Sequence, residues 1–184
     1  MTRNIGLALL ILLPCLSAAQ TSEKHVALSI SGGHDTDRRD GGRPVVLVAA
    51  GLGVPTEVFR KAFSGVHPAR NGRPEPGQVH QNKDALLAVL APYGITNDQL
   101  DRVSDFYRYR PQSGELWRHS DAEGYAIVVK GKVTGFRITK PGYGYSSVPA
   151  VSVPGFENLR LKVEVLYSTK SDTNGSLKSI VISK

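Results

Sequence analysis

The chain has 184 residues, of which 40% are hydrophobic and 21% charged, and it carries a formal net charge of +7 at pH 7. This length suits one domain or two small lobes, and the lone cysteine, Cys15, excludes an internal disulfide and a zinc–thiolate cluster. The positive charge is compatible with an acidic polysaccharide, anionic lipid or DNA as partner, or with solubility alone.

Residues 1–19 are typical of a cleavable secretory signal. Arg3 precedes the apolar run Ile5–Leu13, and small residues lead up to Ala19. This run is too short for a membrane span, which takes about 20 apolar residues. We therefore expect cleavage between Ala19 and Gln20, and a secreted or periplasmic chain with no transmembrane span in its mature part. A lipoprotein anchor at Cys15 is the alternative.

Residues 20–43 predict a short strand and then a polar loop. Val26, Leu28 and Ile30 alternate with smaller or polar residues, which is the period of a half-buried strand. The loop that follows, Ser31–Arg43, is rich in Gly, Asp and Arg. We expect this loop to be exposed and to precede the first helix.

Three carboxylates in this loop, Asp35, Asp37 and Asp40, form a candidate calcium site. Calcium takes several hard oxygen ligands from a flexible turn, and the spacing resembles an EF-hand-type loop with one residue inserted. The bidentate acid expected at the end of such a loop is missing, and Arg38 and Arg39 would repel a cation. The alternative is a turn stabilised by salt bridges, and calcium is the only cofactor that the sequence suggests.

The same loop is the best place for catalysis, because His34 stands next to Asp35. A histidine oriented by a carboxylate can serve as the base for a serine nucleophile. No nucleophile elbow or phosphate-binding glycine loop accompanies the pair. A hydrolase that uses the His34–Asp40 loop therefore stays an alternative to a noncatalytic role.

Residues 44–108 predict a helical lobe. Thr96 and Gln99 form a capping-box pattern at the start of its last helix. The segment His67–His80 is rich in Pro and Gly and is expected to be a loop. The expected helices are Pro44–Ala50, a helix after Pro55 with an apolar stripe to Val66, Asp84–Ala91, and a helix that starts at Thr96.

These helices form an internal repeat. The segment Val45–Phe63 aligns with Leu86–Ser104, and Gly53 in the first copy matches Gly94 in the second. Each copy reads helix, tight glycine turn, hydrophobic residue, helix. Because neither pair can bury its apolar face alone, we expect the two helical hairpins to pack together.

The first hairpin resembles a helix-turn-helix over Val48–Phe63. In such a fold the second helix enters the major groove, where Arg60 and Lys61 could contact phosphate. Three features count against nucleic acid: the export signal, Pro55 in place of a hydroxyl cap, and acidic residues such as Asp98 on the corresponding helix of the second copy.

Residues 109–121 are expected to be the linker to a second part. The lone tryptophan, Trp117, lies in this linker and is expected to pack between the two parts. Arg108, Tyr109 and Arg110, at the end of the last helix, form a candidate ligand surface that could stack on a sugar or a base. The basic end of a helix favoured by its dipole explains the same residues equally well.

Residues 122–184 predict an antiparallel β module, because the hydrophobic period changes to two. Lys130-Gly131 and Asn174-Gly175 are turn dipeptides, and the second favours a tight hairpin. The expected strands are Tyr125–Val129, Val133–Ile138, Val151–Val153, Leu161–Tyr167 and Leu177–Ile182.

One motif in this part carries a resemblance. Gly142-Tyr-Gly144-Tyr145 is followed by Pro149, and this pattern resembles the Gly-x-Gly-Tyr-x-x-x-Pro β-repeat of bacterial surface and phage-tail-like proteins. The resemblance implies a structural or display module, with Tyr145 folded back over the sheet. The whole chain also resembles secreted bacterial proteins.

The sequence therefore predicts an α+β protein, with an N-terminal helical lobe of two related hairpins followed by a small antiparallel β module. The interpretation that we prefer is a noncatalytic secreted module for binding or structural display, with an acidic polysaccharide or a surface protein as partner. The alternatives are a hydrolase at the His34–Asp40 loop and nucleic-acid binding through the helical repeat.

Overall fold

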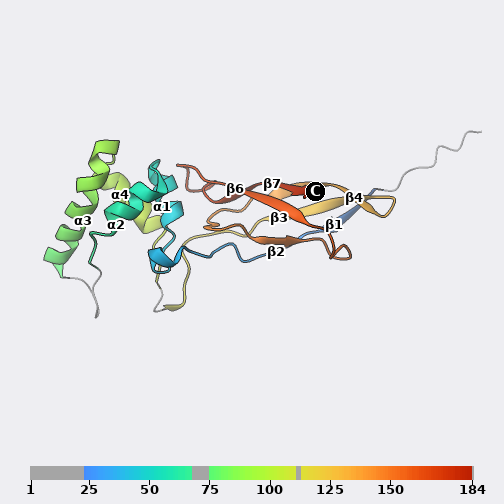
Figure 1. The fold of residues 1–184 in the computed structure, drawn as a ribbon, viewed down its shortest axis with the longest axis horizontal. Helices are drawn as coiled ribbons and strands as arrows, with labels where there is room; N and C mark the ends of the chain where they lie inside the picture. Colours follow the sequence, from blue (N-terminus) through green and yellow to red (C-terminus); the bar gives the residue numbers. More distant parts are fainter. Residues whose placement is uncertain (1–22, 68–74, 111–112, 184) are drawn as a thin grey trace, which may run out of the picture.

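The structure is a computed structural model that describes residues 23–67, 75–110 and 113–183. Of the described residues, 32% are helical and 29% lie in strands or bridges, so the predicted α+β fold class is confirmed. The helices gather at one end of an elongated molecule and the strands run along the rest of it (Figure 1). The expected signal, residues 1–19, and its cleavage position lie outside the described residues.

The expected helices and strands are present with shifted ends, but the first expected strand is two strands, Glu23–Ala27 and Ser29–Ser31, and two 3-10 helices were not predicted. The helical lobe contains the 3-10 helices η1 (Arg38–Asp40) and η2 (Ala91–Tyr93), and the α-helices α1 (Val45–Leu52), α2 (Thr56–Phe63), α3 (Pro76–Leu90) and α4 (Asn97–Phe106). The strands are β1 (Glu23–Ala27), β2 (Ser29–Ser31), β3 (Glu123–Val129), β4 (Lys132–Lys140), β5 (Ala150–Ser152), β6 (Leu161–Leu166) and β7 (Ser176–Ile182).

The helical lobe is inserted into the β module. Strand β1 pairs antiparallel with β3 in a sheet of order β1-β3-β4, and β2 pairs antiparallel with β5. The strands before the lobe thus complete sheets whose other strands come after it. Residues 20–43 were predicted to lie apart from the β module, because strand pairing between distant segments leaves no local pattern in the sequence.

Both helical hairpins use the same turn. Gly53 and Gly94 adopt left-handed conformations after α1 and η2, where a side chain would be strained. The residue after each glycine donates its backbone N–H to the preceding helix, Val54 to Ala49 and Ile95 to Leu90. Val54 and Ile95 are both buried in the helical core, so each turn inserts one hydrophobic residue.

The helix α3 begins eight residues before the expected position of Asp84, and this prediction was wrong. Pro76 stands in the first turn of the helix, where its missing N–H costs nothing. A proline-rich stretch can therefore end at a helix start instead of continuing as a loop. The capping box at Thr96 is confirmed, because Thr96 accepts from the Gln99 N–H and the Gln99 side chain accepts from the Thr96 N–H.

The Gly142–Tyr145 loop lies where the linker returns to the β module. A Cβ at Gly142 or Gly144 would lie 2.5 Å from the Ser120 carbonyl oxygen or 2.7 Å from His119, and both glycines have positive φ. The Tyr145 ring is buried, and its hydroxyl accepts a hydrogen bond from the Ala122 N–H. The tyrosine thus folds back onto the start of β3, which the resemblance predicted.

The two turn dipeptides behave differently. Lys130 and Gly131 both have positive φ and join β3 to β4 as a two-residue hairpin loop. Asn174 and Gly175 do not form a tight hairpin, because β6 ends at Leu166 and β7 begins at Ser176. The loop between these strands is longer and carries Asn174 into the protein interior, so the prediction of a tight hairpin here was wrong.

Asn174 connects the β module to the helical lobe. Its side chain is fully buried, with 0% exposed. The side-chain amide donates to the Leu47 carbonyl of α1 at 2.8 Å and to the Tyr107 hydroxyl at 2.9 Å, and the Asn174 Oδ1 accepts from the Ser168 N–H. Every hydrogen-bonding group of the side chain is thus used at the junction.

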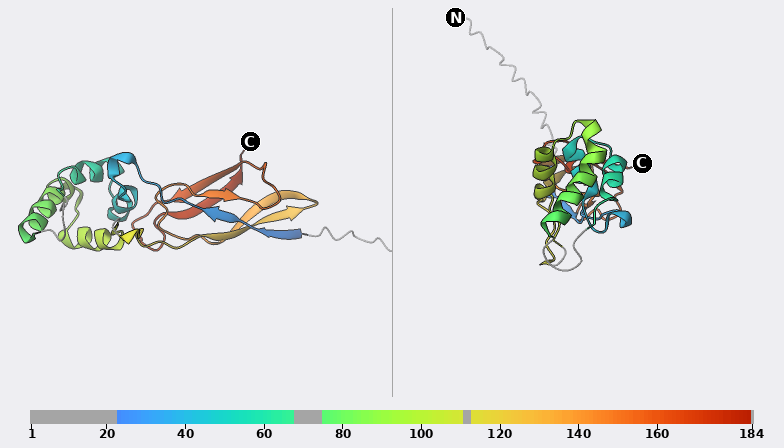
Figure 2. Two further views of the ribbon diagram at one scale, coloured as in Figure 1. Left: turned by 90° about the horizontal axis from the view of Figure 1, so that it is seen from below. Right: turned by 90° about the vertical axis from the view of Figure 1, so that its left-hand side faces the viewer.

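Trp117 forms the second connection, as the sequence predicted. The indole is 2% exposed and packs against the helical core, and its Nε1–H donates to the Gly144 carbonyl at 2.8 Å. The views along and across the long axis agree that the helices stack on the end of the strands (Figure 2). The two contacts fix the lobe in one orientation.

We predict that Asn174→Ala destabilises the protein by about 3 kcal/mol, because a buried carbonyl and a buried hydroxyl lose their partner. Tm should fall by roughly 6–12 °C, since a domain of this size loses about 2–4 °C per kcal/mol. Calorimetry of the variant beside Asn158→Ala, whose side chain is exposed, measures the difference. Equal Tm values for Asn174→Ala and Asn158→Ala would show that the hydrogen bonds of Asn174 do not stabilise the junction.

Candidate functional site

Arginine side chains pair with the carboxylates of the loop after β2. Arg60, on α2, donates from Nε to Asp40 Oδ1 at 2.7 Å and from Nη2 to Asp40 Oδ2 at 2.9 Å. Asp40 is nearly buried, with 6% exposed. Asp37 lies 3.7 Å from the same guanidinium, and Glu57 also pairs with it. The guanidinium thus occupies the position between Asp37 and Asp40 that a cation would need.

Asp37 also caps the 3-10 helix η1. It accepts from the Arg39 backbone N–H at 2.9 Å and from the Arg39 side chain. These hydrogen bonds from Arg39 hold the pKa of the Asp37 carboxyl well below its usual range. The hydrogen bonds that Arg60 donates to the Asp40 carboxylate correspondingly raise the pKa of the Arg60 guanidinium. Both charges are therefore fixed over the whole physiological pH range.

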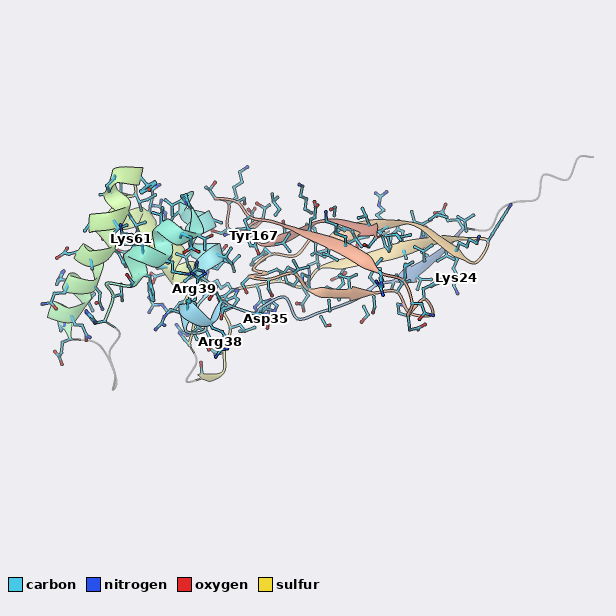
Figure 3. All side chains as sticks on the ribbon, viewed as in Figure 1. Lys24, Asp35, Arg38, Arg39, Lys61 and Tyr167 are labelled. Carbon is cyan, nitrogen blue, oxygen red and sulfur yellow. The ribbon has the colours of Figure 1, made fainter. Side chains whose placement is uncertain are left out.

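Asp35, the third residue of the predicted calcium site, lies on the same loop (Figure 3) and lines the same pocket as Asp37 and Asp40. Its backbone N–H donates to the Ser147 hydroxyl at 3.1 Å, and its carboxylate lies 3.4 Å from the same hydroxyl. In the described part of the chain, no three His, Cys, Asp or Glu side chains are grouped so that they could hold a metal ion. Arg60 therefore pairs with two of the three carboxylates, Asp37 and Asp40, while the carboxylate of Asp35 contacts Ser147.

His34 lies in an aromatic cluster at the junction. Its ring is stacked with Tyr145 at a centroid distance of 5.3 Å and lies 4.6 Å from His119 and 6.0 Å from Trp117. Its Nε2 is buried and has no hydrogen-bond partner among the described residues. Burial lowers the pKa of His34, and the neighbouring His119 lowers it further, while Asp121 and Asp35 act in the opposite direction.

This environment does not provide a catalytic triad in the described part of the chain. The Asp35 carboxylate contacts Ser147 and not the imidazole of His34. The second histidine of the cluster, His119, bonds through Nδ1 to the Trp117 carbonyl. Ser147, His34 and Asp35 therefore lie in one region, but they do not form the hydrogen bonds from aspartate to histidine and from histidine to serine that acyl transfer requires.

The predicted ligand surface is divided between two places. Arg108 and Tyr109 line a groove of about 200 Å³ in the helical lobe. Arg110 lies outside this groove, in an isolated bridge with Glu115, and their side chains are 3.7 Å apart. Two of the three predicted residues, Arg108 and Tyr109, are therefore brought together. They line a groove between helices and do not form a flat surface.

This groove, named here the Arg43 groove, opens between the N-terminal end of α1, the C-terminal half of α2 and the end of α4. Val48, Phe59 and Tyr107 lie at its floor and belong to the helical core. Arg43 and Arg108 stand at its rim. The helices expose a small apolar surface here because four short helices cannot close around the core at their ends.

Arg43 is held by an aromatic ring and not by a carboxylate. Its guanidinium carbon lies 5.1 Å from the centroid of Phe63, within the range of a cation–π contact. Within the described residues, no carboxylate pairs with Arg43, whereas Arg108 pairs with Asp105. The groove therefore combines an apolar floor with a positively charged rim.

The Arg43 groove also meets the junction. Tyr109, at its edge, contacts Trp117 edge to face, at a centroid distance of 6.3 Å and an interplanar angle of 62°. Burial raises the pKa of Tyr107, at the floor, to about 12, partly offset by the hydrogen bond from Asn174. The phenol stays neutral and anchored, so the floor has a fixed shape.

Sequence reasoning missed Arg43, Phe63 and Arg60 as parts of these sites. Arg43 directly precedes the helix-starting Pro44, a position that can hold a side chain over the end of a helix. This weak signal could have pointed to Arg43. No local signal indicates that Arg60 pairs with Asp40, because the two residues are joined only by the fold.

No family model, curated protein or solved structure matches this chain. None of the helices in the described residues is long and apolar enough to cross a membrane.

We predict that Arg60→Ala destabilises the protein by about 3 kcal/mol, because it leaves the nearly buried Asp40 carboxylate without a partner. The neighbouring Lys61→Ala should change the unfolding free energy by less than about 0.5 kcal/mol, since Lys61 is exposed. Urea unfolding of both variants measures this. Similar losses of unfolding free energy in Arg60→Ala and Lys61→Ala would show that the pairing of Arg60 with the carboxylates contributes little to stability.

We predict that stability depends on pH through His34. Its pKa in the folded protein lies below the ordinary value of 6.5, so the unfolded chain binds a proton more readily. The contribution of His34 is present above pH 6.5 and is lost as the pH falls through the lower folded pKa. Urea unfolding at about pH 7.5 and about pH 5 should show a smaller loss in His34→Gln than in the unchanged protein. His80→Gln, on the exposed surface of α3, should behave like the unchanged protein, and an undiminished loss in His34→Gln would contradict the assignment.

Proposed function

We propose that the protein is a noncatalytic secreted binding module, in which the β module presents the helical lobe and its Arg43 groove to a ligand. The observation that carries this proposal is the insertion of the lobe between β2 and β3. Both connections of the lobe therefore enter the β module at one end, while β1 begins near the other end (Figure 1). If the protein is attached to a surface through the segment before β1, the helical lobe lies at the end of the molecule that points away from that surface.

The contacts at the junction favour a helical lobe held in one orientation over a lobe that moves freely relative to the β module. Asn174 and Trp117 each bond across it with buried hydrogen bonds. Buried polar groups favour one geometry, since any other arrangement would leave them unsatisfied. A ligand would thus meet a preformed surface, which reduces the entropy that binding costs.

The alternatives have less support. A hydrolase at the His34–Asp40 loop would need a nucleophile near His34, and among the described residues none is bonded to its Nε2. Nucleic-acid binding through α2 would need Arg60 to reach phosphate, but this guanidinium is bonded to Asp40 and paired with Glu57. An acidic polysaccharide or a surface protein remains the expected partner, because each carries carboxylates.

The proposal predicts that orientation controls binding. Lys24 and Lys61 lie at opposite ends of the molecule (Figure 3), and Cys15 is the only natural thiol. In a Cys15→Ser background, Lys24→Cys and Lys61→Cys each give one coupling site. Protein coupled to a sensor surface through residue 24 should bind labelled alginate or labelled peptides with free carboxylates better than protein coupled through residue 61.

Mass spectrometry of the recovered probes gives the control. Unchanged probes support a noncatalytic role. Chemically altered probes, with the alteration lost in His34→Ala, would replace the proposal by the hydrolase alternative. Equal binding in both orientations would contradict presentation of the helical lobe.

A further inference from the structure

The floor of the Arg43 groove has the chemistry of a pocket for one apolar side chain. Val48, Phe59 and Tyr107 are 8%, 4% and 2% exposed, so the groove reaches the edge of the helical core. Its volume of about 200 Å³ is small, which excludes a long acyl chain or several sugar rings lying in it. Filling it would remove this remaining apolar surface from water.

The rim of the groove has the chemistry of an anion site. Arg39, Arg60 and Arg110 are bonded to or paired with carboxylates, whereas Arg43 is in contact with the face of Phe63. This contact orients the Arg43 guanidinium without neutralising it. A planar guanidinium matches a carboxylate with two parallel hydrogen bonds. Arg108 adds a second positive charge at the rim, partly balanced by Asp105.

Polar groups beside the apolar floor favour a peptide over a lipid as the ligand of the groove. Ser104 and Tyr109 also line the groove, and their side chains can bond to amide groups. An acyl chain offers no hydrogen-bonding groups next to its carboxylate and would leave these side chains without a ligand partner. A sugar acid would place hydroxyl groups against the apolar floor, where they would lose their bonds to water.

We propose that the Arg43 groove binds the C-terminal end of a polypeptide whose last residue is apolar. The terminal carboxylate pairs with Arg43 and is attracted by Arg108, and the last side chain fills the pocket over Val48 and Phe59. This inference rests on the proposed binding function and names its ligand. It makes the partner a protein with an exposed C-terminus instead of a polysaccharide.

Fluorescence anisotropy with the full chain tests this assignment. The probes are a fluorescein-labelled hexapeptide that ends in phenylalanine with a free carboxylate, the same peptide with a terminal amide, and the same peptide ending in serine. The free carboxylate should bind about tenfold or more tightly than the amide, because a charge-assisted pair contributes roughly 1.5–3 kcal/mol. The peptide ending in serine should bind more weakly as well.

Variants identify the groove as the place of binding. Arg43→Gln should bring the affinity for the free carboxylate close to that for the amide, with Arg108 accounting for the remaining preference. Arg43→Lys should restore part of the affinity, since lysine keeps the charge but cannot form two parallel hydrogen bonds. Arg102→Gln, which removes an exposed arginine of α4 outside the groove, should leave affinity unchanged. Thermal unfolding of each variant shows whether it is folded.

Three results would overturn the assignment. They are equal binding of carboxylate and amide peptides, unchanged affinity in folded Arg43→Gln, and binding of laurate without binding of the peptide. If any of these occurs while capture of probes still depends on coupling through residue 24 or residue 61, only the ligand of the groove is wrong. If capture is independent of orientation, the binding function itself fails.

Discussion

The side-chain amide of Asn174 is the contact on which the relation between the two lobes depends. It comes from a loop of the β module, and its partners belong to α1 and to the end of α4. A buried amide can satisfy these groups in one arrangement only, and a shift of the lobe would leave three polar groups without partners. Gly175 follows at once, with no room for a Cβ between Leu47 and the Tyr145 backbone, so the loop can enter the junction closely.

The Gly142–Tyr145 loop supports this junction from the other side. The glycines let the loop pass close to the returning linker, and the Gly144 carbonyl accepts the indole N–H of Trp117. Tyr145 then packs against Gly33 and stacks with His34. The Gly142–Tyr145 loop thus serves to attach the inserted helical lobe, and it leaves the half-buried His34, with its buried Nε2, next to that attachment.

Arginine has two contrasting roles in the helical lobe. Arg60 is bonded to Asp40 and fixes the loop after β2 against α2. Arg43 lies near the same loop but faces Phe63. The first arrangement is neutral and structural, while the second leaves a positive charge beside an apolar floor. This difference separates a stabilising pair from a candidate binding site.

Local patterns in the sequence determined the elements. The period of hydrophobic residues, the glycine turns at Gly53 and Gly94, and the capping box at Thr96 each depend on neighbours within a few residues, so they could be predicted. The tertiary structure alone decided that β1 and β2 belong with β3 and β5, that Asn174 turns inward, and that Arg60 replaces a cation between Asp37 and Asp40. These outcomes join residues that are distant in the chain, and the energy that selects among such pairings comes from burial and hydrogen bonding that no local pattern records.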